Sequence, residues 1–271
     1  MTIRFRNRLT FVFFIITFTT FLLSAFLTWY QYLTVGITLP EVFIKSPSSN
    51  FLLRYNPYIV FSTMSFEMIY VCITTMIIYH SFEKTQAPDI AFFLIFLAAC
   101  LFDATRFVIP VFQISGTYSK LLLKVRNIHL FARLLAPLAL LGNTIMSTDD
   151  FRQHTDRNCL IIIIVALFFS EMIPLNTAVI LPNFCISYGY VKAIRGFSLL
   201  VCIVSAISLF NTNRKNEYKQ IMTIGFILLC IGYTLIFYCY NILSLAAGTL
   251  FLGIGTYLYL NEVHKHYLWI D

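Results

Sequence analysis

Residues 221–260 read IMTIGFILLCIGYTLIFYCYNILSLAAGTLFLGIGTYLYL and contain no Asp, Glu, Lys, Arg or His. As a single α-helix this run would be about 60 Å long, twice the roughly 30 Å hydrocarbon core of a bilayer. A soluble domain cannot cover so much apolar helix surface. The run therefore predicts two membrane-spanning helices, 221–240 and 242–260, joined by a tight hairpin at Asn241.

The rest of the chain has the same character. Of its 271 residues 59% are apolar and 11% are charged, whereas soluble domains have about 45–50% and about 25%. Apolar runs of about twenty residues recur, and this length spans a bilayer. We predict an all-α fold, a polytopic transmembrane helix bundle that makes residues 1–271 a single integral membrane domain. Its eight helices are expected over 9–30, 58–79, 90–112, 121–146, 159–181, 191–210, 221–240 and 242–260.

Several other classes of protein and site are disfavoured. The net charge of +7 comes mostly from basic residues in short loops, so a lipid bilayer is expected as partner and nucleic acid is not. The seven cysteines form no CxxC pair and mostly lie in apolar runs, which indicates small buried hydrophobes rather than a disulfide framework or a metal site. Only His129 lies inside a predicted span, so no haem or other cofactor is expected.

Lys and Arg residues set the expected orientation. With the N-terminus inside, the cytoplasmic segments hold ten of these residues and the outer segments hold seven. Arg4, Arg6 and Arg8 precede the first helix, and no basic residue follows it closely. By the positive-inside rule we expect a protein of the cytoplasmic (inner) membrane with both termini in the cytoplasm.

Ionisable side chains inside four predicted spans lie at similar depths. Asp103 and Arg106 are three residues apart, while Arg126, His129 and Arg133 are spaced by three and four, so each set shares one helix face. With a rise of 1.5 Å per residue, these positions fall about 7–18 Å below the outer boundary. Charges at such depths are costly and mark functional candidates. The predicted ligand-binding residues are Glu67, Asp103, Arg106, Arg126, His129, Arg133 and Glu171.

Two interpretations of these charges remain open. In the first they only fix helix packing, with Asp103 paired to Arg106 and either Glu67 or Glu171 paired to Arg133. In the second they line a polar cavity that opens outward. Surplus arginines would then bind a small anionic ligand, because the planar guanidinium group matches carboxylate and phosphate.

A set of short motifs from Asn56 onward resembles one known family. The motifs are Phe66-Glu67, Leu101-Phe102-Asp103, Leu134-Leu135-Ala136-Pro137-Leu138, Leu181-Pro182-Asn183-Phe184, Arg214-Lys215 and a glycine-bearing final hairpin. Over about 200 residues this layout resembles the third type of membrane-associated sensor domain of bacterial signalling proteins. The resemblance implies detection of small molecules or of membrane state. Because no output domain follows, it also implies a separate protein partner.

The function predicted from these observations is a receptor-like sensor or scaffold module with an outward-facing polar site. The alternative is a small transporter, or a membrane subunit of a transport complex, that uses the same charges as a substrate path. An enzyme is not favoured, because the sequence has no GxSxG or HExxH motif. Asp103 with His129 is the one acid–base combination that the charged residues suggest.

Overall fold

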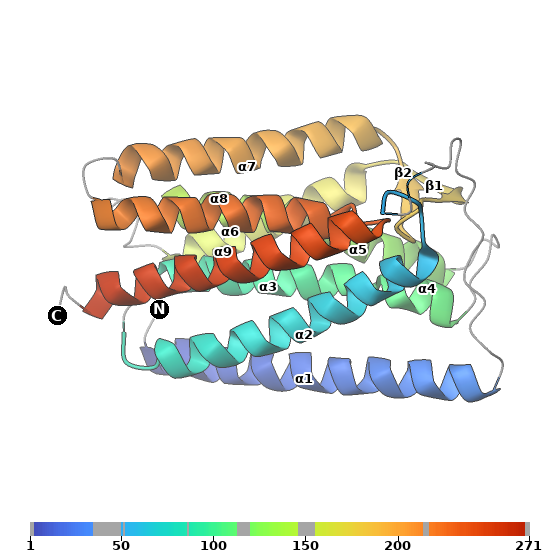
Figure 1. The fold of residues 1–271 in the computed structure, drawn as a ribbon, viewed down its shortest axis with the longest axis horizontal. Helices are drawn as coiled ribbons and strands as arrows, with labels where there is room; N and C mark the ends of the chain where they lie inside the picture. Colours follow the sequence, from blue (N-terminus) through green and yellow to red (C-terminus); the bar gives the residue numbers. More distant parts are fainter. Residues whose placement is uncertain are drawn as a thin grey trace.

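The computed structural model describes residues 3–34, 50, 52–85, 87–112, 120–145, 155–213 and 217–268. These residues form a bundle of long helices lying side by side, with one small sheet at an end of the bundle (Figure 1). α1 lies at one edge beside α2, and α7 lies at the opposite edge. The predicted all-α helical bundle is confirmed.

The element bounds follow the predicted spans closely in most of the chain. Within the described residues, seven helices are long and apolar enough to cross a membrane, which supports a multi-pass membrane protein. The full set of helices in the described part of the chain, long and short, is α1 Ile3–Thr34, α2 Pro57–Ser81, α3 Asp89–Ala104, η1 Thr105–Phe107, α4 Val108–Val111, α5 Lys120–Ile145, α6 Thr155–Met172, α7 Val191–Asn213, α8 Glu217–Phe237 and α9 Ile242–Leu268. The strands are β1 Leu175–Ile180 and β2 Ile186–Tyr188.

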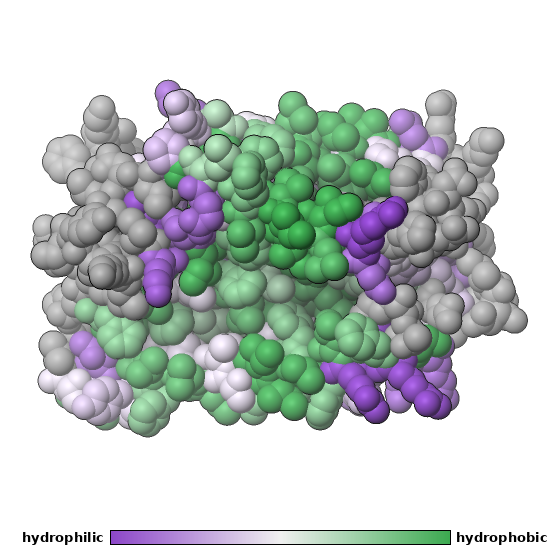
Figure 2. Space-filling view, turned by 180° about the vertical axis from the view of Figure 1, so that it is seen from behind, coloured by the Kyte–Doolittle hydropathy of each residue, from purple (hydrophilic) through white to green (hydrophobic). Residues whose placement is uncertain are grey.

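The start of α1 and the end of α9 lie at the same end of the bundle, here named the termini end (Figure 1). Arg6 donates a 2.6 Å hydrogen bond to the carbonyl of Thr85 and another to that of Phe82. The ring of Phe82 meets that of His264 edge-on at 5.2 Å. The β1–β2 sheet marks the opposite end, the hairpin end, and a hydrophobic belt separates hydrophilic patches toward the two ends (Figure 2).

The break predicted at Asn241 is present. The Asn241 side chain accepts a 2.8 Å hydrogen bond from the backbone N–H of Ser244, the interaction of a helix N-cap, and α9 begins at Ile242. α8 and α9 then lie in backbone contact. A Cβ atom added at Gly225 would be 2.8 Å from the backbone nitrogen of Tyr259, and one added at Gly232 would clash with the backbone of Leu252. Glycines therefore allow α8 and α9 to approach each other closely.

The prediction of a helix over 159–181 was wrong in its second half. α6 ends at Met172, and an antiparallel hairpin of β1 and β2 follows. Pro174 explains the change, because proline lacks an N–H group and disfavours the helical conformation of the residue before it. The strand after it, LNTAVI, contains β-branched residues that suit a strand.

The predicted span 90–112 is also interrupted. α3 ends at Ala104, η1 forms a 3₁₀ turn, and α4 continues for four residues. Such a turn inside a helix tightens the backbone and redirects the side chains that follow. It carries Arg106, one of the predicted site residues. Arg214 and Lys215, which contribute to the family resemblance, lie outside the described residues.

The path of the chain predicts the sidedness of two positions. α7 runs from the hairpin end to the termini end, so Asn213 and the end of α9 face the same compartment. Topology reporters fused after Asn213 and after Asp271 are expected to give the same reading, and a reporter inserted between α1 and α2 the opposite one. Different readings from the two fusions would contradict this arrangement.

The glycine contacts predict that two Gly→Ala substitutions differ in their effect on stability. Gly225→Ala must separate α8 from α9 and is expected to lower the free energy of unfolding by about 1–3 kcal/mol. Gly253→Ala is the matched control, because a Cβ there meets nothing within 4 Å. It is expected to be neutral or stabilising, since alanine favours helix. Thermal unfolding in detergent measures both, and equal losses would refute the contact argument.

Candidate functional site

A buried group of charges surrounds Arg106 at the hairpin end of the bundle. Arg106 Nη2 lies 2.5 Å from Asp103 Oδ2 and 3.1 Å from Glu67 Oε1. His129 Nε2 lies 3.5 Å from Asp103 Oδ1. These residues, together with Arg133, form what we call the charged cluster. Residues of α2, α3, η1 and α5, which are distant in sequence, thus lie side by side.

The 3₁₀ turn η1 orients Arg106. Its Nε donates a 3.2 Å hydrogen bond to the carbonyl of Asp103, three residues earlier. Its Nη1 donates another of 3.2 Å to the carbonyl of Asn183, in the loop between the strands. The guanidinium is fully buried and has acceptors on three sides. Arg106 therefore joins α2, α3 and the β1–β2 hairpin at one point.

Arg133 is held by a thiol, a phenol and aromatic rings. Its Nη1 donates a 2.6 Å hydrogen bond to the Tyr188 hydroxyl, and its Nη2 lies 2.9 Å from Cys185 Sγ. Its guanidinium lies 4.5 Å from the ring centroid of Phe237 and 5.3 Å from that of Tyr238. The structure pairs Glu67 with Arg106, and no ion pair joins a described carboxylate to Arg133 at short range. Cation–π contacts of this kind stabilise a desolvated arginine.

The turn of the hairpin covers the cluster. Phe184 has a φ of 58°, a conformation that costs a residue with a side chain about 1–2 kcal/mol. Its ring is fully buried against Val60 and Met64 of α2. The side chain of Asn183 donates a 3.3 Å hydrogen bond to the carbonyl of Phe237. Packing and hydrogen bonding thus hold the turn in its strained conformation over the charges.

Arg126 lies on the same face of α5, nearer the hairpin end. Its side chain is 2% exposed, and its Nη2 donates a 2.8 Å hydrogen bond to the carbonyl of Ser187 in β2. Its Nε and Nη1 have no acceptor among the described residues, nor does Arg126 make an ion pair there. An arginine that is buried and only partly satisfied is unusual, because each unbonded donor is costly away from water.

Glu171 lies apart from the cluster. It is exposed on α6, one residue before the helix ends, and its carboxylate accepts hydrogen bonds of 3.2 and 3.3 Å from the side chain of Asn127. Asn127 points to a different side of α5 from Arg126, because successive residues on a helix are about 100° apart. The expected convergence of Glu171 with the other charges therefore does not occur.

Cys185, like Tyr188, is a member of the site that sequence reasoning missed. Its Sγ lies 3.5 Å from His129 Nδ1, and the other ring nitrogen of His129 faces Asp103. The order Cys–His–Asp is that of a nucleophile, a base and an orienting acid. Its position in the sequence was a signal, because Cys185 directly follows Asn183-Phe184 in the proline-containing loop. A cysteine in an apolar chain by itself indicates only packing, so the residue was not selected.

The surroundings of Cys185 favour binding over nucleophilic chemistry. The residue is 2% exposed. Burial raises the pKa of its thiol above the ordinary value, although Arg133 and Arg106 act in the opposite direction. The neutral thiol is a poor nucleophile at neutral pH. Among the described residues, no three His, Cys, Asp or Glu side chains are placed to hold a metal ion.

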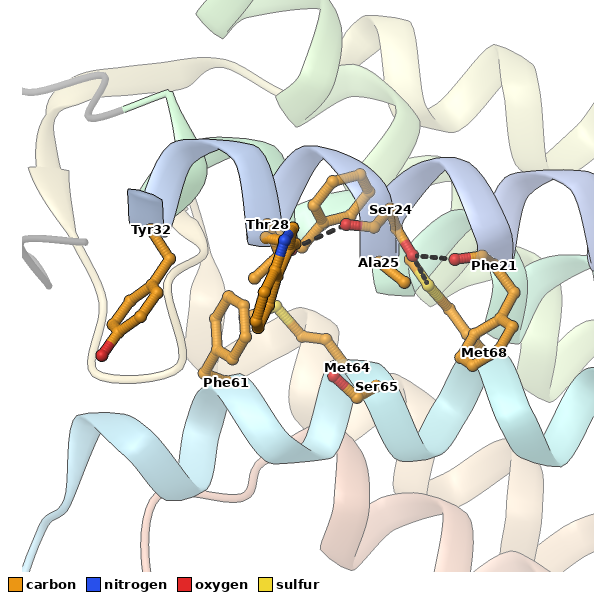
Figure 3. Close-up of a pocket in the computed structure, with 11 residues that line it drawn as sticks. Phe21, Ser24, Ala25, Thr28, Tyr32, Phe61, Met64, Ser65 and Met68 are labelled. Atoms are coloured by element: carbon orange, nitrogen blue, oxygen red, sulfur yellow. Dashed lines mark hydrogen bonds between the residues drawn. The ribbon is translucent and has the colours of Figure 1, made fainter. Parts of the chain in front are cut away.

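A separate hollow of about 350 Å³ lies between α1 and α2 (Figure 3). Phe21, Ala25 and Thr28 of α1 face Phe61 and Met64 of α2 across it. The Ser24 hydroxyl and the Met68 sulfur, 3.1 Å apart, connect the two helices. No Asp, Glu, Lys, Arg or His lines this hollow, so it has the character of lipid-facing helix surface rather than of a polar site.

No protein-family model, curated protein or solved structure matches this chain. Functional inference therefore depends on the geometry of the site and on the chemistry of its residues.

The charged cluster predicts a large effect from removing its central cation. Arg106→Met leaves Glu67 and Asp103 without their ion-pair partner in a buried setting, and is expected to lower the free energy of unfolding by about 3–5 kcal/mol. Adding Glu67→Gln removes one uncompensated charge and should restore part of the loss. Unfolding in SDS measures these differences.

The comparison for this experiment is an ion pair whose cation is exposed. Lys265 Nζ lies 2.7 Å from Glu262 Oε1, and the lysine side chain is 52% exposed while that of the glutamate is 9% exposed. Lys265→Met is expected to lower the free energy of unfolding much less than Arg106→Met, because the lysine is solvated and its attraction to Glu262 is screened by water. A similar small effect for Arg106→Met would contradict the ion-pair geometry described above.

Proposed function

We propose that this chain is a receptor-like membrane module that binds a small anionic ligand at the hairpin end. The observation that carries the proposal is the state of Arg126. It is 2% exposed, yet two of its three guanidinium nitrogens have no acceptor among the described residues. An anionic group is the ligand that would satisfy these donors and compensate the charge.

The balance of charge supports an anion in particular. The carboxylates of Glu67 and Asp103 form ion pairs with Arg106, whereas Arg133 is held by Tyr188, Cys185 and aromatic rings. Arg126 and Arg133, on one face of α5, are then cations without an ion pair among the described residues, and Arg126 has the larger number of unbonded donors. A cation without a paired carboxylate produces a local positive potential, which attracts negatively charged solutes. Carboxylates, phosphates and sulfates of small size fit this description.

The hairpin gives the ligand a way to change the structure. Arg126 holds β2 through Ser187, Arg106 holds the turn through Asn183, and Arg133 holds β2 through Tyr188. A ligand that binds Arg126 competes with the Ser187 carbonyl for the same guanidinium. Binding would therefore alter one of the contacts that fix the hairpin, and a differential contact of this kind is what a ligand-driven switch requires.

The packing of the core supports a binding module over a transporter. A transport path would have to continue from the charged cluster to the termini end. Phe93, Phe96 and Leu97 of α3 occupy this direction and are fully buried. The ring of Phe93 stacks on Tyr259 of α9 at 5.8 Å. Interiors packed in this way have few voids larger than a water molecule.

We further propose an orientation and a route for the signal. The bias of Lys and Arg supports an orientation in which the termini end faces the cytoplasm and the bundle lies in the inner membrane. The hairpin end then faces outward, where the ligand arrives. In keeping with the resemblance to bacterial membrane-associated sensor domains, a separate protein partner would contact the cytoplasmic end, with the bundle acting as sensor or scaffold.

The proposal predicts anion-dependent stability that requires Arg126. Inorganic phosphate is the probe, because it carries the charge without any other recognition group. At a concentration 100 times its dissociation constant, a bound ligand adds about 2.7 kcal/mol to the free energy of unfolding. The full-length protein in detergent is expected to show such a rise, and Arg126→Gln is expected to remove it.

Arg157→Gln, on an exposed residue near the start of α6, is the control and should keep the full response to phosphate. A matched titration with sodium chloride separates binding from ionic strength. The proposal is abandoned if phosphate stabilises Arg126→Gln as much as the unmodified chain, or if phosphate and chloride act alike.

A further inference from the structure

A crevice of about 360 Å³ lies at the hairpin end, between the start of α7, the end of α8 and the start of α9. It is distinct from the charged cluster, because none of the five cluster residues lines it. Its polar lining residues are Arg195, Thr234, Tyr238, Tyr240, Asn241 and Ser244, and its apolar wall includes Leu199 and Leu235. We propose that this crevice binds the headgroup of an anionic phospholipid.

Arg195 lines the crevice and is oriented by an aromatic ring. Its guanidinium carbon lies 4.4 Å from the ring centroid of Tyr238, a cation–π contact. The side chain is exposed, and no ion pair with a described carboxylate involves it. Beside it the helix surface is open, because a Cβ atom added at Gly196 would meet nothing within 4 Å. A positive charge is thus fixed in direction but left available to a ligand.

The order of polar and apolar groups matches a phospholipid. Arg195 lies in the second turn of α7, close to the membrane boundary at the hairpin end. Leu199 lies one turn further along α7, about 6 Å toward the centre of the bilayer. A phosphate at Arg195 would therefore continue into acyl chains along Leu199 and Leu235. A free phosphate ion would use the charge but leave the apolar wall without a partner.

The crevice is connected to the charged cluster through one ring. Tyr238 contacts Arg195 at 4.4 Å and Arg133 at 5.3 Å, both measured from guanidinium carbon to ring centroid. Tyr238 also meets Phe237, another of the rings that lie over Arg133. A lipid phosphate at Arg195 would change the electrostatic surroundings of the ring that supports Arg133. The lipid site stands on the crevice alone, whether or not Arg126 binds an anion.

The test compares lipids on the full-length protein purified in detergent and stripped of bound lipid. Phosphatidylglycerol is the anionic probe, phosphatidylcholine is the neutral control of similar shape, and inorganic phosphate tests for a free-anion site. Bound lipid is counted by native mass spectrometry over a concentration series. We expect phosphatidylglycerol to bind more tightly than phosphatidylcholine, and Arg195→Gln to weaken phosphatidylglycerol binding about fivefold, the effect of one basic residue near a lipid surface.

Lys192→Gln is the matched control, because it removes the same charge from an exposed residue one turn away that does not line the crevice. It should retain most of the phosphatidylglycerol affinity. An equal loss in Lys192→Gln would assign the effect to general surface charge and overturn the site. Equal binding of both lipids would overturn it as well. Displacement of phosphatidylglycerol by millimolar phosphate would show that the crevice is a site for a free anion and would overturn the lipid proposal.

Discussion

The contact of Arg106 with Asp103 and Glu67 is the interaction on which the hairpin end of this protein depends. A guanidinium at this depth cannot face lipid without a large cost, so its acceptors must come from the protein itself. They come from α2, α3 and the loop between β1 and β2. The requirement to satisfy one buried cation therefore determines how three separate segments meet, which apolar packing between helices in a membrane would specify less tightly.

The two halves of the bundle show different ways to hold helices together. Toward the termini end, the interior is built from aromatic and aliphatic side chains such as Phe93, Phe96 and Tyr259. Toward the hairpin end, arginines on α5 reach to backbone carbonyls and aromatic rings of the hairpin and α8. Packed apolar layers resist change, while polar contacts can exchange one acceptor for another. A site that responds to a ligand is better placed in the second kind of interior.

Sequence reasoning recovered the fold class and the break at Asn241, because hydrophobic run length and helical rise are local properties. It did not recover the hairpin. A helix was expected over 159–181, yet α6 ends at Met172, just before Pro174, and the residues that follow the proline form strands. Glu171 was also expected beside the charged cluster. The depth of a residue along its helix does not determine toward which neighbouring helix its side chain points. Cys185 and Tyr188 entered the site through tertiary contacts that no spacing rule contains.

The burial of Arg6 bears on how the protein is made. Of the three arginines before the apolar part of α1, Arg4 and Arg8 are exposed and Arg6 is buried against the carbonyls of Phe82 and Thr85. Those carbonyls belong to a segment that is synthesised about eighty residues later. Until that segment has been made, Arg6 lacks both carbonyls as partners, and basic residues beside a first helix influence its orientation during insertion. Once α2 and α3 have followed, Arg6 connects α1 to the loop between them through its hydrogen bonds to Phe82 and Thr85. The same side chain is therefore available at two stages, for the orientation of α1 and then for its packing.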